Sequence, residues 1–262
     1  MTTLSLDGRT AIVTGSTRGI GTALARRLHG AGAAVVVTGL ESGAGEDLAA
    51  ELGARALFVP ADLRSDEAID ACIARALDRF GRLDILVNNA CHYPDRGLDA
   101  TRAEWLETLN VNLVGAAVFT AKAAAVMTAP GGVVVNLGSV GGKFGTAGRA
   151  LYPASKAGLV QFTRNAAVTL APRGIRVLAV SPGWTWTPAL AALAGTPERA
   201  DAVGRRLHPA GRAGRAEDVA DAVLFACSDL AGFMTGTEIP VDGGYSILGP
   251  DQGRPVREWF SE

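Results

Sequence analysis

Residues 152–156 read YPASK and place Tyr152 four positions before Lys156, with Ser139 a short way upstream in an apolar run. On a helix, positions i and i+4 share a face, so the phenol and the ammonium lie side by side. An ammonium about 4 Å from a phenolate, at an effective dielectric of ~20, stabilises the phenolate by roughly 4 kcal/mol. At about 1.4 kcal/mol per unit, this lowers the pKa of a phenol from its ordinary value near ~10 by up to three units. The pair is therefore a candidate proton-transfer group, although the same spacing also occurs in ordinary solvated helix faces.

A glycine-rich stretch near the start of the chain has the chemistry of a phosphate cradle. Residues 14–21 read TGSTRGIG, follow the apolar segment 11–13 and precede an amphipathic run over 22–29. Glycines between a strand and a helix let backbone N–H groups approach a pyrophosphate at the helix N-terminus. The spacing is G-x-x-x-G-x-G, which differs from the commoner G-x-G-x-x-G. A simple helix entry without a ligand is the alternative interpretation.

Five motifs occur in an order that resembles the short-chain dehydrogenase/reductase family, and within it the 3-oxoacyl carrier-protein reductase-like branch. They are the glycine-rich turn, Asn88-Asn89-Ala90, Ser139, Y-x-x-x-K and Pro182-Gly183. The match spans residues 7 to about 245. The resemblance implies a Rossmann-like fold, a nicotinamide cofactor, and hydride transfer at a carbonyl or alcohol carbon without a metal.

The resemblance also implies site residues, each carried over to a matching position. The catalytic residues would be Asn112, Ser139, Tyr152 and Lys156. The cofactor-binding residues would be Gly15, Ser16, Thr17, Arg18, Gly19, Ile20, Gly21, Asp62, Leu63, Asn89, Ala90, Tyr152, Lys156, Pro182, Gly183, Thr185 and Thr187.

Particular roles follow from the resemblance for some of these residues. Asp62 would accept a hydrogen bond from the adenine amino group, and Asn89 would brace a strand end beside the adenosine ribose. Asn112 would hold a water that links the lysine to solvent, and Thr187 would contact the nicotinamide amide. As alternatives, Asp62 and Asn89 are ordinary turn residues.

The implied mechanism divides the work among three side chains. Ser139 and Tyr152 hydrogen-bond the substrate oxygen, and Tyr152 gives or takes its proton. Lys156 lowers the pKa of Tyr152 and holds the nicotinamide ribose. Pro153 has no N–H to donate and is tolerated in the first turn of a helix, which places Tyr152 near a helix start.

The choice of cofactor depends on the residue that ends the second strand, where an Asp or Glu favours NAD. Gly39 occupies that position, and Arg18 matches a basic position of NADP-using relatives. Leu40 stands where an Arg is often found, and Glu41 is close enough in sequence to turn toward the ribose. We expect NADP, with NAD as the alternative.

Apolar runs without period-2 alternation indicate strands buried on both faces. They cover 10–13, 34–37, 56–59, 85–87, 133–137, 176–180 and 238–241, and helical runs separate them. The pattern predicts an α/β fold, a single doubly wound parallel sheet with helices on both faces, over residues 1–262. Ligands of such sheets bind beyond the carboxyl ends of the strands, where Gly15, Asp62, Asn89, Ser139 and Pro182 fall. Residues 185–210 are expected to form a substrate lid, and 246–262 a C-terminal tail.

Composition suits a compact enzyme: 262 residues, 48% hydrophobic, 19% charged, with 33 glycines. The net charge of -1 gives no electrostatic case for nucleic acid or an anionic membrane. No early segment combines a charged start, a long apolar core and a cleavage site, so we expect a cytoplasmic chain. Three scattered cysteines and three scattered histidines indicate neither a disulfide framework nor a zinc site.

Two local features have competing interpretations. Arg205, Arg206, Arg212 and Arg215 form a basic cluster, interpreted as a solvated mobile loop rather than a contact for an acidic substrate group. Cys91 stands where the family usually has glycine, and packing into the pocket floor is favoured over reshaping it. His92 follows directly and shares its neighbourhood.

Three functional classes are weighed. An oxidoreductase acting on a small-molecule carbonyl or alcohol is preferred because all four reactive positions are present. A catalytically silent cofactor-binding or scaffold protein is the second class. A nucleic-acid-binding protein lacks the basic face that it needs. Within the first class, 3-oxoacyl carrier-protein reductase is an alternative, not preferred because residues 127–132 contain no basic group.

The tail ends in two adjacent aromatics, Trp259 and Phe260. The resemblance implies a homotetramer, in which two-fold axes bring C-termini close to a neighbouring subunit. We expect these rings to dock across a subunit interface near the neighbour's cleft, with packing on their own subunit as the alternative.

Overall fold

One sheet of seven parallel strands organises the computed structural model, which describes residues 4–249 and 251–260. The strands are β1 (Thr10–Thr14), β2 (Ala34–Gly39), β3 (Ala56–Pro60), β4 (Ile85–Asn88), β5 (Val133–Leu137), β6 (Arg176–Pro182) and β7 (Glu238–Val241). They lie in the order β3-β2-β1-β4-β5-β6-β7. All strands expected from the sequence are present, and several extend a residue or two further at their carboxyl ends. The predicted fold class is confirmed.

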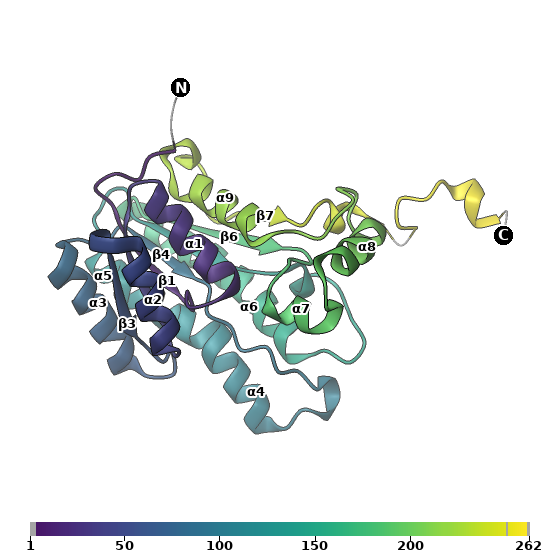
Figure 1. Ribbon diagram of the computed structural model, residues 1–262, viewed down its shortest axis with the longest axis horizontal. Helices are drawn as coiled ribbons and strands as arrows, with labels where there is room; N and C mark the ends of the chain where they lie inside the picture. The colour runs from purple at the N-terminus through teal and green to yellow at the C-terminus, as the bar shows by residue number, and fades with distance from the viewer. Residues whose placement is uncertain (1–3, 250, 261–262) are drawn as a thin grey trace.

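Helices cover both faces of this sheet (Figure 1). They are α1 (Gly19–Gly30), α2 (Ser42–Leu52), α3 (Asp66–Phe80), α4 (Arg102–Leu109), α5 (Ala116–Val126), α6 (Leu151–Leu170), α7 (Pro188–Ala194), α8 (Pro197–Leu207) and α9 (Ala216–Cys227). Helices α1 and α9 pack on one face and contribute Leu24 and Val219 to its core. Helices α3 and α5 pack on the other and contribute Ile69 and Phe119.

The strands explain why their sequences show no polar alternation. In β1, Val13 belongs to the core under α1 and α9, whereas its neighbour Ile12 belongs to the core under α3 and α5. In β2, Val37 and Val36 divide in the same way. Because both faces of the sheet are covered, successive side chains are buried on opposite sides, and most positions are apolar.

The strand order reverses at β1, which pairs with β2 on one side and β4 on the other. Val13 of β1 lies opposite Val37 and Val87 in register. Connections from the two halves of the sheet leave in opposite directions at this point, which opens a crevice beyond the carboxyl ends of the strands. The candidate site residues cluster around this crevice.

A continuous helical stretch from Arg102 to Val126 comprises α4, a π-helical turn over Asn110–Gly115, and α5. By length and composition alone it is apolar enough to cross a membrane. Phe119 and Ala123 are fully buried against the sheet, so this stretch serves as a core helix, and core helices pass the same test.

Two short helices fill the segment expected to form the lid. Thr187 caps α7 by accepting a hydrogen bond from the Leu190 N–H, and Thr196 caps α8 by accepting one from Arg199. Threonine is a favoured N-cap because its hydroxyl satisfies an otherwise unpaired N–H. The last described segment, which includes the short helix Val256–Phe260, extends away from the body of the molecule (Figure 1).

Candidate functional site

A cleft of about 590 Å³ lies beyond the carboxyl ends of the strands at the point where the strand order reverses. Its walls come from the turns after β1, β2, β3 and β4 and from the start of α7. The predicted cofactor-binding residues that line it are Gly15, Thr17, Arg18, Gly19, Ile20, Gly21, Asp62, Leu63, Asn89, Ala90 and Thr187. Segments far apart in the sequence therefore meet in one cleft, as the motif order predicts.

Other residues predicted to bind the cofactor have side chains directed elsewhere. The Ser16 hydroxyl is fully buried, donates to the Val13 carbonyl at 2.7 Å and accepts from the Thr38 N–H at 2.9 Å. Gly183 and Thr185 line a separate cavity of about 300 Å³, and Thr185 donates to the Gly183 carbonyl at 3.1 Å. Pro182 ends β6 next to them. In this structure the side chains of Ser16 and Thr185 stabilise turns.

The glycine-rich turn brings backbone so close that side chains are excluded. Gly15 has φ +61°, and a Cβ there would lie 2.7 Å from the Cα of Ala90. A Cβ on Gly21 would lie 2.2 Å from the Gly15 carbonyl oxygen. Helix α1 begins at Gly19, and its first residues line the cleft. The N–H groups of this first turn have no partner within the helix, and the glycines leave them accessible from the cleft. Such a helix N-terminus suits a pyrophosphate.

Asn89 ties the end of β4 to the end of β1. Its side-chain amide donates to the carbonyls of Thr14 and Gly15, both at 2.9 Å. In return, the Thr14 hydroxyl accepts from the N–H groups of Asn89 at 2.9 Å and Ala90 at 3.0 Å. These four bonds fix the glycine-rich turn relative to β4.

Charged side chains at one end of the cleft are paired with each other. Asp62 accepts from the Arg64 guanidinium at 2.9 and 3.0 Å, and this hydrogen bond holds the pKa of the Asp62 carboxyl below its usual range. Arg18 forms an ion pair with Glu41 at 3.0 Å, with 68% and 48% of their side chains exposed. The Arg18 guanidinium therefore lies beside Glu41, which follows the end of β2.

Tyr152 is the second residue of α6, as the following proline predicts. The buried Asp95 carboxylate accepts from the N–H groups of Ala150 at 2.9 Å and Tyr152 at 3.0 Å, so it caps the start of this helix. Burial alone would raise the pKa of Asp95, but these backbone N–H groups outweigh it and lower the pKa. No motif in the sequence marks Asp95, because a single Asp in a loop has no characteristic spacing.

Lys156 lies one turn further along α6 and is 3% exposed. Its ammonium donates to the Leu137 carbonyl at 2.7 Å and lies 5.7 Å from the centroid of the Tyr152 ring. Ser139 follows β5 and accepts from the Gly141 N–H at 3.0 Å, and its side chain acts to lower the pKa of the Tyr152 phenol. The predicted serine, tyrosine and lysine are thus brought together.

The structure corrects the expected pKa of Tyr152. Burial raises the pKa of the phenol because the phenolate loses its hydration, and the nearby Lys156 ammonium and the Ser139 hydrogen bond lower it only in part. The sequence argument included the cation but not the enclosure of the ring. The phenol is therefore protonated at neutral pH, which suits a proton donor.

Asn112 is almost completely buried in the π-helical turn between α4 and α5. Its amide donates to the His92 carbonyl and to the Ser155 hydroxyl, both at 3.0 Å, and its oxygen accepts from the His92 N–H at 2.6 Å. Both amide hydrogens are therefore used by the protein. The side chain joins the segment after β4 to α6 between Tyr152 and Lys156.

The segment after β4 forms the wall of the cleft next to these residues. The Tyr93 ring stacks on Tyr152 with centroids 5.4 Å apart. Cys91 is half-buried and lines the cleft, and burial raises the pKa of its thiol although Lys156 lies close enough to oppose this. No three His, Cys, Asp or Glu side chains group as metal ligands within the described parts of the chain.

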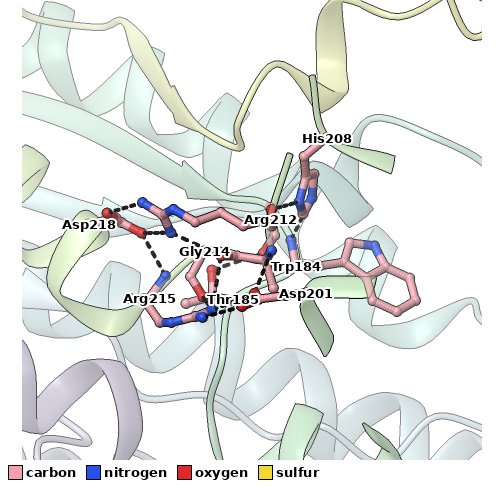
Figure 2. A network of polar contacts seen from close by, with 10 residues as sticks. Trp184, Thr185, Asp201, His208, Arg212, Gly214, Arg215 and Asp218 are labelled. Carbon is pink, nitrogen blue, oxygen red and sulfur yellow. Dashed lines mark hydrogen bonds and ion pairs between the residues drawn. The ribbon is translucent and has the colours of Figure 1, made fainter. Parts of the chain in front are cut away.

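In the basic cluster at the end of the lid, Arg212 and Arg215 are held in ion pairs, whereas Arg205 and Arg206 lie exposed in the last turn of α8. Figure 2 shows its two later arginines in a polar network. Arg212 donates to Asp218 at 2.7 and 2.8 Å, and Arg215 donates to Asp201 at 2.9 and 2.7 Å. Both guanidinium groups are bidentate on carboxylates of α9 and α8, so they anchor the lid. The acidic partners come from the flanking helices α8 and α9.

His208 connects the same network to the segment after β6 (Figure 2). Its Nδ1 lies 2.7 Å from the Arg212 carbonyl oxygen, and its Nε2 accepts from the Trp184 N–H at 3.4 Å. A carbonyl can only accept, so Nδ1 carries the hydrogen. Backbone bonds between Trp184 and Gly214 and between Gly214 and Trp186, both 2.8 Å, complete the connection.

Comparisons with known proteins agree with this geometry. A family model described as enoyl-(acyl carrier protein) reductase matches residues 15–246. The chain is 42% identical to a cis-4-hydroxycyclohexanecarboxylate dehydrogenase of Sinomonas cyclohexanicum, over 92% of this chain and 97% of the relative. It is 38% identical to a 3-oxoacyl-[acyl-carrier-protein] reductase of Aquifex aeolicus, over 92% of this chain and 98% of the relative.

A second dehydrogenase of Sinomonas cyclohexanicum, specific by its name for trans-4-hydroxycyclohexanecarboxylate, is 35% identical over 90% of this chain and 92% of the relative. Among solved structures, a glucose/ribitol dehydrogenase-type protein from Brucella melitensis superposes with a TM-score of 0.85 at 33% identity. That alignment covers 91% of this chain and 97% of the other.

Proposed function

The chain belongs to the short-chain dehydrogenase/reductase family of oxidoreductases, and we propose that it transfers a hydride between NADP and a ketone or secondary alcohol through Tyr152, Lys156, Ser139 and Asn112. The observation that carries this proposal is the convergence of Ser139, Tyr152 and Lys156 next to the cleft. Incubating the protein with NADPH or NADH and a panel of ketones tests it, because cofactor consumption that depends on the ketone is the expected result. A catalytically silent cofactor-binding protein would consume none.

The cleft fits a nicotinamide dinucleotide. Gly15 and Gly21 leave room that a Cβ would fill, and α1 presents its N-terminus there, which suits the pyrophosphate. We assign Asp62 to the adenine end, Thr187 to the nicotinamide end, and Lys156 to the ribose between them. When bound, the cofactor supplies or accepts the hydride, and the protein supplies position and protons.

In the proposed reaction, the hydroxyls of Ser139 and Tyr152 hydrogen-bond the substrate oxygen. The Tyr152 phenol gives its proton to that oxygen in reduction and takes it back in oxidation. The Lys156 ammonium favours the phenolate that forms, because an opposite charge nearby stabilises the charged state. Asn112 acts as a positioning residue, since its side chain fixes the wall at His92 against α6.

Arg18 is proposed to select NADP. A guanidinium pairs with a 2′-phosphate through charged hydrogen bonds, each worth about 1.5–3 kcal/mol, whereas NAD has no equivalent group. Arg18→Ala is therefore expected to raise the dissociation constant of NADPH by about 10–100-fold and that of NADH far less. Titration of protein fluorescence with each cofactor measures both constants.

Arg26→Ala is the matched control. Arg26 lies on α1, which begins directly after Arg18, and pairs with Glu51 outside the cleft, so both affinities should stay unchanged. Glu41 pairs with Arg18 and would compete with the phosphate, so Glu41→Gln should strengthen NADPH relative to NADH. Equal losses for both cofactors in Arg18→Ala, or a wild-type preference for NADH, would overturn the assignment to NADP.

The names of the relatives suggest two substrate classes. Two are dehydrogenases of cyclic hydroxy acids, and another reduces 3-oxoacyl groups on a carrier protein. We favour a small-molecule ketone or secondary alcohol, and we retain 3-oxoacyl-[carrier protein] reduction as the second candidate because of the 38% identity. A panel that includes cyclic ketones and a 3-oxoacyl thioester separates the two.

We further propose a homotetramer in which the tail of one subunit reaches a neighbour. Trp259 and Phe260 are 46% and 86% exposed in the single chain. Burying these two rings against a neighbouring subunit would stabilise the tetramer by roughly 3–6 kcal/mol, at about 1.5–3 kcal/mol for each ring. Removing residues 249–262 is therefore expected to weaken the tetramer and raise KM several-fold.

Light scattering gives the mass in solution, and initial rates give KM. The double substitution Trp259→Ala and Phe260→Ala keeps the length of the tail and should reproduce the effect of the deletion. A tetramer of unchanged mass with unchanged KM in both variants would leave the tail without this role.

A further inference from the structure

Arg149 places a positive charge next to the phenol proposed to carry the proton. It lies just before α6, and its guanidinium carbon is 4.9 Å from the centroid of the Tyr152 ring. The side chain is 42% exposed, so it faces solvent as well as the ring. Its charge acts on Tyr152 and on Tyr93 and Cys91, two residues that line the cleft next to Tyr152. A cation is therefore available where the substrate must enter.

The guanidinium has little to bind within the protein. Its Nε lies 3.9 Å from a carboxylate oxygen of Asp95, and this is the one ion pair it makes among the described residues. Asp95 is already engaged, because it accepts backbone N–H bonds from Gly97, Ala150 and Tyr152. A guanidinium has five N–H donors in a planar fork. Most of the hydrogen-bonding capacity of Arg149 is left for another acceptor.

Other cations around the cleft are more fully paired. Arg64 donates to Asp62 and Glu107, at 2.8 Å to the latter. Arg18 pairs with Glu41 at 3.0 Å, and Lys143 with Glu238 at 3.3 Å. Arg149 differs from these three cations because its single contact with a carboxylate, at 3.9 Å to Asp95, is longer than theirs. In addition, Asp95 already accepts hydrogen bonds from backbone N–H groups at the start of α6.

A purely structural role is the competing explanation, since a cation over an aromatic ring attracts the ring and holds it in place. Tyr152 is already held without Arg149. Tyr93 stacks on its ring, and Asp95 fixes its backbone. The remaining property of Arg149 is its exposed, poorly paired charge.

We propose that Arg149 binds a carboxylate carried by the substrate away from the reacting carbon, so that the natural substrate is a keto acid or hydroxy acid. This inference rests on the proposed function, because it takes Tyr152 as the group that meets the substrate oxygen. A guanidinium binds a carboxylate with two parallel hydrogen bonds, which also fix its orientation. Anchoring the acid in this way holds the carbonyl or alcohol carbon in place beside Tyr152.

Matched substrates with and without the charge test the proposal. Two pairs are suitable: 4-oxocyclohexanecarboxylate with its methyl ester, and the open-chain 4-oxopentanoate with its methyl ester. For the wild-type holoenzyme, kcat/KM is expected to favour the acid over the ester by at least about 10-fold in one or both pairs, because a charged hydrogen bond contributes about 1.5–3 kcal/mol.

In Arg149→Gln this preference should disappear through a higher KM for the acid, while kcat for the ester stays near the wild-type value. Arg149→Lys keeps the charge but loses the fork, so it should retain part of the preference. Arg96→Gln is the control, because Arg96 is a nearby exposed arginine paired with Glu104 at 3.6 Å and should leave the preference intact.

A binding measurement gives a second readout without turnover. Calorimetric titration of cyclohexanecarboxylate into the NADP-loaded protein should show a dissociation constant about 10–100-fold higher for Arg149→Gln than for wild type. Unfolding temperatures of the two proteins should agree, since the substitution is at an exposed side chain.

The possible failures are distinguishable. Equal wild-type efficiency on acids and esters, or equal losses on both in Arg149→Gln, would overturn the carboxylate site and leave the oxidoreductase function in place. Turnover of ketones that lack a carboxylate, with none for either acid, would do the same. A wild-type protein that reduces no ketone of any kind would instead contradict the proposed function.

Discussion

Tyr152→Phe is expected to lower turnover by about 10²–10⁴-fold, the loss typical when a general acid or base is removed. The substitution removes the hydroxyl that donates the proton and keeps the ring that stacks on Tyr93. The glycine-rich turn is untouched, so the dissociation constant of the cofactor should stay near the wild-type value. Initial rates of cofactor oxidation and a fluorescence titration measure the two quantities.

Tyr93→Phe is the matched control, because it removes a phenol from the neighbouring ring. We expect it to retain most of the activity, since Ser139 and Lys156 act on the pKa of Tyr152 and the Tyr93 phenol is not the proposed proton donor. If Tyr152→Phe kept near-normal turnover while Tyr93→Phe lost it, the proton donor would have been assigned to the wrong ring.

Lys156→Met is expected to lower turnover by about 10²-fold. The ammonium lies 5.7 Å from the centroid of the Tyr152 ring and favours the phenolate, because an opposite charge nearby stabilises the charged form. Methionine keeps the length of the side chain but not its charge. The affinity for cofactor should fall as well, because the ammonium is proposed to hold the ribose.

The pH profile separates this effect from simple misfolding. Tyr152 already has a raised pKa, and loss of Lys156 raises it further because the cation opposes burial. Alcohol oxidation needs the phenolate, so its rate rises with pH and the rise should shift to higher pH in Lys156→Met. Ketone reduction needs the phenol and is lost as pH rises through the pKa, so that loss should shift upward too. Lys122→Met, at an exposed lysine paired with Asp70, should leave both profiles in place.

The sequence predicted the strands well because a parallel sheet covered on both faces needs continuous apolar runs. Residues 133–137 show this, since all five are buried and the prediction matches β5 at both ends. The glycine-rich turn was equally predictable, because Gly15 and Gly21 occupy positions where any Cβ would meet backbone. Buried strands and glycine-rich turns can be predicted because the residues that determine them lie close together in the sequence.

Features that depend on distant partners could not be predicted. Asp95 caps α6 across more than fifty residues, and the acidic partners of Arg212 and Arg215 come from helices on either side of them. The pKa of Tyr152 was predicted to fall because the sequence shows its cation but not the burial that opposes it. Thr185 stays a predicted cofactor contact, and its backbone pairing with Gly214 and the burial of its side chain were not predicted.

Transfer of an isotopic label tests the central claim most directly. The wild-type protein is incubated with a ketone that it consumes and with NADPH carrying deuterium at the nicotinamide C4 position, and the alcohol is analysed by mass spectrometry and NMR. We predict that one deuterium appears on the carbinol carbon when one of the two C4 positions is labelled, and none when the other is. In deuterated water with unlabelled NADPH, the carbinol carbon should gain none. An alcohol whose carbinol hydrogen comes from solvent, or no alcohol from any ketone in the panel, would contradict hydride transfer by this protein.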